Sequence, residues 1–438
     1  MLQPKDFKDR RKQLMRRMKK NSVAVLASAP ASIRNRDVEY PYRQHSDFHY
    51  LTGFHEPEAV AVLAPGRKQG EFVLFCREFD PEKAIWTGKH AGLEGAREQF
   101  GADEAFPIAE LDEQLPVLME DHDRVYFPIG HDAELDHAVM AAVNDVRGRA
   151  RSGVHAPHEF VTLEHVLHEQ RLFKSPAEIR LMRRAAEASV RAHQRAMRAC
   201  RPGRHEYEIE AELLHEFAMH GMRSPAYPCI VAAGVNACVL HYTDHDAILN
   251  DGDLLLIDAG AECENYAADI TRTFPVNGQF SESQRLIYEL VLQAQGAAIK
   301  DIRPGRRWID FHDTAVKVLT RGLVELGLLE GKVSKLIKDE AYKRFYMHRT
   351  GHWLGMDVHD VGAYRVDGEW RKLEPGMVLT VEPGLYIAPD CTDVDPRWRG
   401  IGVRIEDDVL VTKDGCEILT AAMPKSVADI EAFMAGAA

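Results

Sequence analysis

The sequence predicts a two-part α/β protein whose second part is an internal duplication. Over about the first 170 residues, short apolar runs alternate with helical stretches, which is typical of an α/β domain. A helix start at Ser175 and two matching ten-residue segments further along indicate a second domain. The 438 residues fit two or three domains, and we expect domains at 1–172 and 173–438.

The composition is that of an ordinary globular protein, with 45% hydrophobic and 28% charged residues. The formal charge of 55 − 68 = −13 disfavours sequence-independent binding to nucleic acids. The sequence contains no apolar run of about 18 residues, so it predicts no membrane-spanning helix. The seven cysteines form no CxxC pair, which favours a reducing compartment. The basic N-terminus precedes only a short apolar run, Val23–Ala27, which does not fit a signal peptide. We therefore expect a cytoplasmic protein with no membrane partner.

The first part is expected to carry structure but no catalytic site. Phe7–Lys19 predicts a basic amphipathic helix with Leu14 and Met18 facing inward, and Val23–Ala27 a short buried strand. The further elements expected are strands at Ala59–Ala64 and Phe72–Cys76, a helix at Asp132–Val146 and a connection at Ser152–Phe160. The titratable residues of this part are scattered.

Capping patterns define the long helices of the second part. Ser175–Glu178 (SPAE) places Ser at the N-cap, Pro at the first helical position and Glu three residues after the cap. This helix should end near Cys200, and a second should cover Glu206–His220. Ser281–Gln284 (SESQ) repeats the capping pattern, and its helix should end before Pro304.

Two pairs of similar segments in the same order indicate the duplication. The tetrapeptide RPGR occurs twice, each time between a long helix and a following one. Asp251–Gly260 (DGDLLLIDAG) matches Pro375–Gly384 (PGMVLTVEPG), with Gly second, an apolar strand, an acid eighth and Gly tenth. Asp258 and Glu382 therefore occupy equivalent positions, 382 − 258 = 124 residues apart. We expect carboxylates of the two halves to meet across a pseudo-twofold axis.

Asp258 and Asp269 lie in a segment, Leu254–Phe274, that predicts strand, turn and strand. A two-residue turn at Cys263–Glu264 would place Asp258 directly opposite Asp269, whereas a longer turn would shift this register. Opposed Cβ atoms lie about 4.5–5.5 Å apart, where two buried carboxylates are costly unless a cation lies between them. The spacing suits two metal ions about 3.5–4 Å apart.

Glu382 and Glu406 provide the same feature in the second half. Glu382 follows the apolar strand Val378–Val381, and Glu406 ends the apolar run GIGVRIE, where an acid is costly unless it is paired or metal-bound. Asp407 and Asp408 are the alternatives to Glu406, but we interpret them as the polar end of the strand.

Most of the 21 histidines are expected to be surface or core residues without a function. The segment Met347–Asp360 (MHRTGHWLGMDVHD) differs, because it carries His348, His352 and His359. Its glycines argue against a regular helix, so a loop or strand around a site is expected. His241 precedes the first acid-bearing strand as His359 precedes the second.

Four carboxylates and one or more imidazoles form a hard, oxygen-rich donor set. Such a set favours Mn²⁺, Fe²⁺ or Co²⁺, with Zn²⁺ as an alternative, and disfavours a thiolate zinc site. Cys263, expected at the tip of the turn, is not counted as a ligand. An equally consistent interpretation is that the acids form ion pairs with nearby arginines such as Arg272 and Arg404.

Taken together, these segments resemble the aminopeptidase P (Xaa-Pro aminopeptidase) branch of the pita-bread metallopeptidases. In the first part, EYPYR, SDF and LTGF, within residues 39–54, are similar to the non-catalytic N-domain of that family. In the second part, HYT, DAG…DITRTFPVNG, HWLG…DVHDVG, VLTVEPGLYI and GIGVRIEDD are all present. The resemblance covers nearly the whole chain and implies an α/β N-terminal domain followed by a pita-bread catalytic domain.

Carried over position by position, the resemblance implies a site for two Mn²⁺ ions. The implied ligands are Asp258, Asp269, His352, Glu382 and Glu406, with Asp269 and Glu406 bridging both ions. The other residues implied at the site are His241, His348, His359 and Arg404, with Tyr227 and Tyr386 as pocket walls. For Tyr227 and Tyr386 core packing is an equally good interpretation, and Arg404 and His348 have orienting roles as alternatives. The effect of Arg349–Gly351 on substrate preference is not implied by the resemblance.

The implied activity is release of the first residue from peptides with proline in second position. Hydroxide shared by two metal ions would attack the carbonyl carbon, His241 and His359 would bind the oxyanion or substrate, and Glu382 would transfer the proton. The alternatives are a prolidase restricted to dipeptides and a pita-bread protein without catalysis that acts as a binding module. The resemblance also implies a homo-oligomer, either a dimer or a tetramer.

Overall fold

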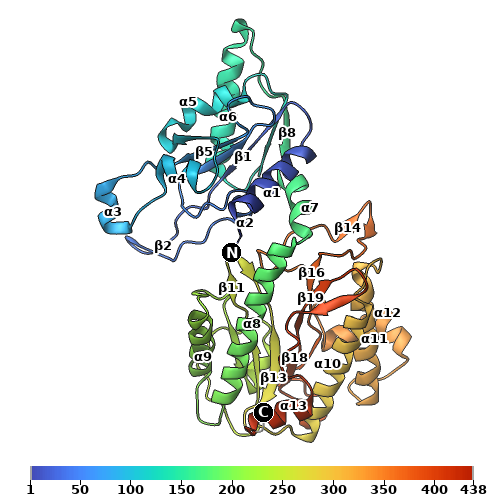
Figure 1. The fold of residues 1–438 in the computed structure, drawn as a ribbon. Coiled ribbons are helices and arrows are strands. Elements are labelled where there is room, and N and C mark those ends of the chain that lie inside the picture. Colours follow the sequence, from blue (N-terminus) through green and yellow to red (C-terminus); the bar gives the residue numbers. More distant parts are fainter. Residues whose placement is uncertain (1, 437–438) are drawn as a thin grey trace. The chain divides into compact units, whose positions relative to one another are not determined.

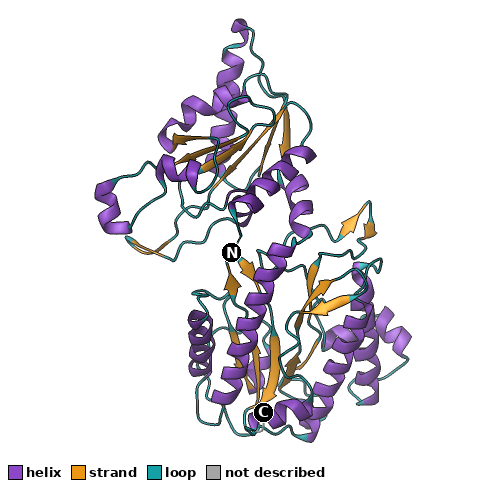
Figure 2. Cartoon of the chain, in the orientation of Figure 1, coloured by secondary structure: helices purple, strands orange, loops and turns teal. Residues whose placement is uncertain are grey.

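The structure, a computed structural model, describes residues 2–436, which divide into two compact units. The first unit extends to Gln170 and the second begins at Arg171. Both units combine helices with β-sheet (Figure 2). None of the helices within residues 2–436 is long and apolar enough to cross a membrane.

The first unit is built on a mixed β-sheet. Its strands are β1 (Ser22–Ala27), β2 (Ile33–Asn35), β3 (Val38–Glu39), β4 (Val60–Leu63), β5 (Phe72–Cys76), β6 (Glu104–Pro107), β7 (Arg124–Phe127) and β8 (Glu159–Thr162). Its helices are α1 (Pro4–Arg17), α2 (Ser46–Thr52), α3 (Pro81–Thr87), α4 (Gly92–Glu98), α5 (Leu111–Met119) and α6 (Ala133–Gly148), and α7 (Glu164–Leu172) crosses the boundary. Six strands form one sheet in the order β6-β5-β4-β1-β7-β8.

The core of this unit lies between the sheet and helices α5 and α6 (Figure 1). Val25 and Val125 of the sheet and Val139 of α6 have no exposed surface. The expected N-terminal helix forms as α1, with Leu14 and Met18 buried. The expected connection at Ser152–Phe160 is wrong at its end, because β8 begins at Glu159 and pairs in parallel with β7.

The second unit consists of short strands flanked by long helices (Figure 1). Its helices are α8 (Pro176–Ala199), α9 (Glu206–Met219), α10 (Glu282–Asp301), α11 (Trp308–Glu325), α12 (Val333–Lys338) and α13 (Val427–Met434). Its strands are β9 (Ile230–Ala233), β10 (Leu254–Asp258), β11 (Glu262–Cys263), β12 (Tyr266–Ala267), β13 (Thr271–Pro275), β14 (Arg365–Val366), β15 (Glu369–Trp370), β16 (Val378–Val381), β17 (Gly384–Ile387), β18 (Ile401–Arg404), β19 (Asp407–Val411) and β20 (Cys416–Ile418). The predicted capping boxes form at Ser175 and Ser281, where α8 and α10 begin.

The predicted duplication is visible in the backbone. The three-stranded sheets β13-β10-β9 and β16-β19-β20 each contain one of the two matching strands, β10 and β16. After each RPGR segment, equivalent backbone bonds join the turn to the strand region: Gly203 N donates to Leu249 O at 2.8 Å, and Gly305 N donates to Leu373 O at 2.9 Å. Leu249 and Leu373 are 373 − 249 = 124 residues apart, the offset that separates the two matching acids.

The predicted pairing of Asp258 with Asp269 is wrong. The turn lies at Glu264–Asn265, both with positive φ, and the strand register pairs Asp258 with Thr271. The turn is one residue later than expected, so every pair shifts by two residues. A shift of two keeps each side chain on its original face. Asp269 therefore still lies beside Asp258, although it precedes β13 instead of pairing within the ladder.

The expected strand through Glu406 is also wrong. β18 ends at Arg404 and β19 begins at Asp407, so Glu406 lies in the break between them. Asp407 and Asp408 are not a polar strand end, because both are buried at the start of β19. Asp407 Oδ1 lies 2.7 Å from the Arg272 guanidinium, and its Oδ2 lies 2.7 Å from Lys425 Nζ.

The buried Asp407–Arg272 pair predicts a stability contrast with an exposed pair of the same unit. Burial opposes ionisation of Asp407, but Arg272 and Lys425 lower its pKa to about 2. The Asp407→Ala variant, which leaves Arg272 buried and unpaired, should lose about 3–5 kcal/mol of unfolding free energy. Glu417→Ala breaks the bond to Arg183, in which both side chains are 42% exposed, and should cost at most about 1 kcal/mol. Urea unfolding measures both, and equal losses would contradict the assignment.

Candidate metal centre

The predicted site residues meet in one pocket of the second unit, with a volume of about 740 Å³. This volume is typical of a ligand-binding pocket. The lining residues include Tyr227, His241, Asp258, Asp269, His348, His352, His359, Glu382, Arg404 and Glu406. Tyr386 lies behind this wall, with its hydroxyl 2.9 Å from His348 Nε2 and 3.0 Å from Arg404 Nη1.

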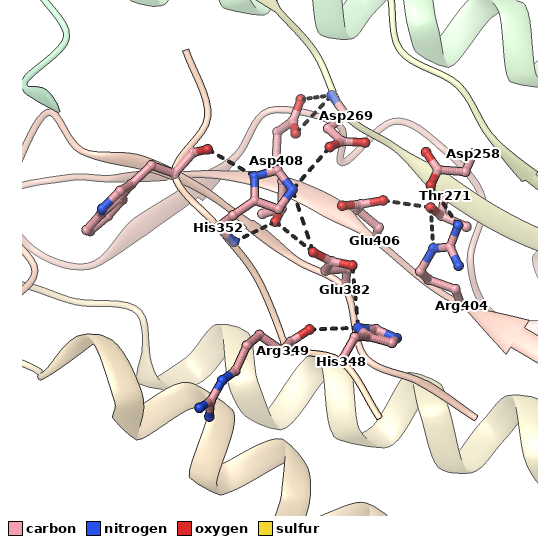
Figure 3. Close-up of polar contacts among 12 residues, drawn as sticks. Asp258, Asp269, Thr271, His348, Arg349, His352, Glu382, Arg404, Glu406 and Asp408 are labelled. Atoms are coloured by element: carbon pink, nitrogen blue, oxygen red, sulfur yellow. Dashed lines mark hydrogen bonds and ion pairs between the residues drawn. The ribbon is translucent and has the colours of Figure 1, made fainter. Parts of the chain in front are cut away.

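Three of the predicted ligands form a compact group. Ligand atoms of Asp269, His352 and Glu406 all lie within 4.8 Å of one another. His352 Nε2 is 3.3 Å from Asp269 Oδ2 and 3.6 Å from Glu382 Oε1, so the ring lies between these two acids (Figure 3). A half-buried imidazole among oxygen donors is a suitable arrangement for a divalent cation.

Asp258 joins this group through Tyr227. The Tyr227 hydroxyl lies 2.6 Å from Oδ1 of Asp258 and 2.6 Å from Oδ1 of Asp269. One hydroxyl hydrogen serves only one acceptor at a time, so Tyr227 does not fully compensate two adjacent carboxylates. The chemistry of the cluster therefore calls for a further positive group at this point.

The ion-pair interpretation holds for some acids and fails for others. Arg404 Nη2 lies 2.7 Å from Asp258 Oδ2, and Arg272 pairs with Asp407. Within residues 2–436, no arginine or lysine side chain forms an ion pair with Asp269, Glu382 or Glu406. These are the acids that remain to bind a cation.

Electrostatics in the pocket favour bound protons when no cation is present. Burial raises the pKa of Glu406 well above its ordinary value, and the charges of Asp269 and Glu382 add to this shift. Burial also raises the pKa of Glu382 to about 7, although His352 opposes the rise. Burial opposes protonation of His352, but Asp269 and Glu382 raise its pKa to about 9. A metal ion that binds here must displace these protons.

Backbone contacts fix the orientation of the two key histidines. His352 Nδ1 donates to Trp353 O at 2.9 Å, which directs Nε2 toward the carboxylates. His348 Nδ1 donates to Arg349 O at 2.7 Å, and its Nε2 accepts from the Tyr386 hydroxyl. Both nitrogens of His348 are therefore engaged by the protein itself.

Strand pairing brings the second half of the cluster together. Thr380 N donates to His352 O at 3.0 Å, and Glu382 N donates to Thr350 O at 2.8 Å. The segment with His352 thus runs beside β16 and places its imidazole next to Glu382. Glu406 N donates to Thr271 O at 3.1 Å, which joins the two halves at the pocket floor.

Sequence reasoning missed several residues that hold this arrangement. Thr271 Oγ1 donates to Glu406 Oε2 at 2.6 Å and accepts from Arg404 Nε at 3.1 Å. The Asp408 carboxylate accepts from Asp269 N at 3.2 Å. A third acid in the run EDD was the available signal for Asp408. Thr271 gave no signal, because threonine is common in strands.

A further part of the pocket wall was also missed. It includes Trp308, Ile309, Phe311 and His312 from α11, and Trp370 from β15. The Trp308 ring lies 4.0 Å from that of Trp353, so this wall continues into the hydrophobic core. The helix carries Asp310, His312 and Asp313 within four residues, which was an available signal, but only folding brings His312 to the pocket.

Comparisons with known proteins identify the family of the chain. Residues 180–413 match the model of Metallopeptidase family M24, and residues 7–126 match the aminopeptidase P N-terminal domain. The Xaa-Pro aminopeptidase of Escherichia coli (strain K12) is 48% identical over 433 residues, covering 99% of this chain and 98% of the relative.

Solved structures agree over the same range. The aminopeptidase PepP of Pseudomonas aeruginosa is 60% identical, with a TM-score of 0.98 over 100% of this chain and 99% of the other. A zinc-substituted Escherichia coli aminopeptidase P in complex with product is 47% identical, with a TM-score of 0.96 over 100% of this chain and 99% of the other.

The raised pKa values predict how the metal-free protein responds to pH. Glu382 shifts from 4.5 to about 7 and His352 from 6.5 to about 9, so both bind more protons when folded than when unfolded. Their contribution to stability should therefore fall as pH rises from about 4.5 to 9. Thermal unfolding of chelated protein at several pH values measures this, with Glu382→Gln expected to flatten the lower part of the profile.

Mn²⁺ should reverse this loss, because metal binding requires the deprotonated ligands. At a concentration of 100 times its dissociation constant, Mn²⁺ should add about 2.7 kcal/mol of stability. A metal-free profile that rises over this pH range, or a melting temperature that Mn²⁺ leaves unchanged, would contradict the prediction.

Proposed function

The chain belongs to Metallopeptidase family M24, with an aminopeptidase P N-terminal domain, and from this membership we propose that it releases the N-terminal residue from peptides with proline in second position. The observation that carries the proposal is the compact group of Asp269, His352 and Glu406, two buried acids and a half-buried histidine, in a pocket of peptide size. Similarity to Xaa-Pro aminopeptidases along 99% of the chain supports the substrate class.

We propose that two Mn²⁺ ions bind at this cluster. Asp269 and Glu406 would be shared by both ions, with Asp258, His352 and Glu382 completing the ligand set. The donors fit such ions, because they are carboxylate oxygens and one imidazole, with no thiolate. Co²⁺, Fe²⁺ and Zn²⁺ suit the same donors. Bound divalent ions supply Lewis acidity and a hydroxide near neutral pH.

The remaining chemistry belongs to side chains around the cluster. Glu382 lies in the pocket lining with Oε1 3.6 Å from His352 Nε2, where its carboxylate would accept a proton and return it to the leaving nitrogen. His241 and His359 lie in the pocket wall, where they are available to hydrogen-bond the substrate carbonyl.

Arg404 and His348 would act by positioning other groups and by shaping the pocket. Arg404 orients Asp258 at 2.7 Å and Tyr386 at 3.0 Å. His348, with both nitrogens bonded inside the protein, shapes the pocket instead of exchanging protons. Burial lowers the pKa of His348 to about 4, which keeps the ring neutral.

A prolidase restricted to dipeptides is the second candidate, because the same cluster suits both reactions. The N-terminal domain match favours the aminopeptidase. Comparing hydrolysis of Ala-Pro with that of Ala-Pro-Ala separates the two. A third interpretation, a binding module without catalysis, requires that the cluster bind no metal.

We also propose a homo-oligomer, a dimer or tetramer, in the cytoplasm. In α3, Ile85 and Trp86 are 82% and 87% exposed, which is unusual for large apolar side chains side by side. The seven cysteines are all free, in keeping with a reducing compartment. Sedimentation velocity at micromolar concentration should give a mass above that of one chain, and a monomer would contradict this part of the proposal.

The central test is metal-dependent hydrolysis of a tripeptide. Chelated protein should release alanine from Ala-Pro-Ala only after Mn²⁺ is added. The Asp269→Asn variant should lose at least about a thousandfold in kcat/KM, as when one member of a catalytic unit is removed. The matched control is Asp339→Asn, an exposed aspartate outside the pocket. If folded wild-type protein with Mn²⁺ leaves the peptide intact, the aminopeptidase proposal fails.

A further inference from the structure

The part of the pocket wall that α11 supplies contains a buried histidine that the proposed reaction does not use. His312 of α11 is only 7% exposed and lines the pocket. Its Nδ1 lies 2.8 Å from Thr350 Oγ1. Its Nε2 has no hydrogen-bond partner among residues 2–436. A ring held on one nitrogen and unpaired on the other is suited to contact a ligand.

Counting hydrogens shows which nitrogen of His312 is the donor. Thr350 Oγ1 also lies 2.5 Å from the hydroxyl of Tyr346, and both residues are fully buried. If Tyr346 donates to Thr350 and Thr350 donates to His312 Nδ1, every hydrogen in the chain is used. Every other arrangement leaves one buried hydroxyl hydrogen without an acceptor, which is costly. His312 therefore carries its hydrogen on Nε2.

The protonation state agrees with this arrangement. Burial lowers the pKa of His312 to about 4, and the charges of Arg349 and Lys343 add to the shift. The neutral ring then has one donor and one acceptor. Because Nδ1 accepts from Thr350, Nε2–H is left as a donor for a ligand.

A cation lines the same pocket as this donor and is near enough for its charge to act on His312. Arg349 lines the pocket, and its exposed side chain extends away from Glu382 and the other acids (Figure 3). Its guanidinium forms no hydrogen bond or ion pair within the described part of the chain. Arg404, the other arginine of the lining, is buried and already bonded to Asp258. Arg349 is thus the lining cation that remains open to a ligand.

From this geometry we propose that His312 and Arg349 form a subsite that binds a carboxylate on the leaving part of the peptide. The subsite rests on the proposed aminopeptidase activity and deepens it. The acid cluster repels a second carboxylate of the substrate, whereas the guanidinium of Arg349, which points away from that cluster, attracts it (Figure 3). Tyr346 and Thr350 act as positioning residues that hold the Nε2–H donor in place.

Two sources of carboxylate fit this chemistry, the C-terminus of a tripeptide and an acidic third side chain. Three substrates separate them: Ala-Pro-Ala with a free terminus, its C-terminal amide, and Ala-Pro-Glu amide. The Mn²⁺-loaded wild type should show a higher kcat/KM, through a lower KM, for the free acid than for the amide. Ala-Pro-Glu amide should match the free acid if a side-chain carboxylate also reaches the subsite, and the neutral amide if only the terminus does.

Two variants test the residues. Arg349→Gln should reduce the ratio of kcat/KM between free acid and amide about fivefold, the scale of an exposed charge pair. Thr350→Val, which removes the hydroxyl that donates to His312 but keeps the shape, should reduce it about tenfold. The control is Arg321→Gln, an exposed arginine of the same helix as His312 but outside the pocket, which should leave the ratio unchanged.

The outcomes are separable from failure of the proposed function. Equal kcat/KM for acid and amide in the wild type, or a ratio unchanged in both variants, overturns the subsite while the aminopeptidase proposal stands. If no substrate is cleaved, the aminopeptidase proposal fails instead, and calorimetry with the dipeptide Pro-Ala and its amide still tests the subsite. Equal affinities of the wild type for these two ligands would then overturn it. Arg349 is exposed, so its variant stays informative if Thr350→Val does not fold.

Discussion

The burial of several carboxylates at one point is the constraint on which the catalytic unit depends. Asp258, Asp269, Glu382 and Glu406 all line the same pocket, and burial raises the pKa of three of them, Asp269, Glu382 and Glu406. Folding such a cluster is costly unless positive charge or protons compensate it. Arg404, Tyr227 and His352 compensate part of the charge, and the remainder is what a cation would neutralise. The strands, their register and the histidine loop all serve to hold like charges at a distance where they can share an ion.

The duplication explains how one chain assembles this cluster. Each half contributes a strand that leads to an acid of the pocket lining: β10 ends in Asp258, and Glu382 directly follows β16. The tenth residue of each matching segment is glycine for a steric reason. A Cβ at Gly260 would lie 1.8 Å from Ala268 O, and one at Gly384 would lie 2.9 Å from Val403 O and 2.4 Å from the Tyr386 hydroxyl. Backbone can approach this closely only at glycine, so the repeat preserves the close approach on which the acid positions depend.

Three consecutive acids show how finely the surroundings decide the state of a carboxyl group. Glu406 faces the pocket and hydrogen-bonds Thr271, with its pKa raised well above the ordinary value by burial and neighbouring acids. Asp407 is held ionised by Arg272 and Lys425. Asp408 accepts from the backbone of Asp269, and burial raises its pKa. Asp407 and Asp408 are successive residues of β19 and point to opposite faces, and Glu406 lies in the break before that strand, so each acid meets different partners. Within this run of three acids, Glu406 is the one that faces the pocket and has no cationic partner.

The sequence by itself determined the long helices with their capping boxes, the α/β class, the duplicated strands and the residue types of the acid–histidine cluster, because caps, periodicity and repeats are local signals.

The tertiary structure alone decided the rest. The turn at Glu264–Asn265 set the register of Asp258 against Thr271, since a turn shifted by one residue was equally compatible with the sequence. The break before β19 separated Glu406 from Asp407. The wall with His312 and Trp308 came from a helix that is distant in sequence, and packing against Trp353 brought it to the pocket. The choice of acids that arginine neutralises also depends on contacts between residues that are distant in the sequence. An ion pair forms only between groups that the fold brings next to each other.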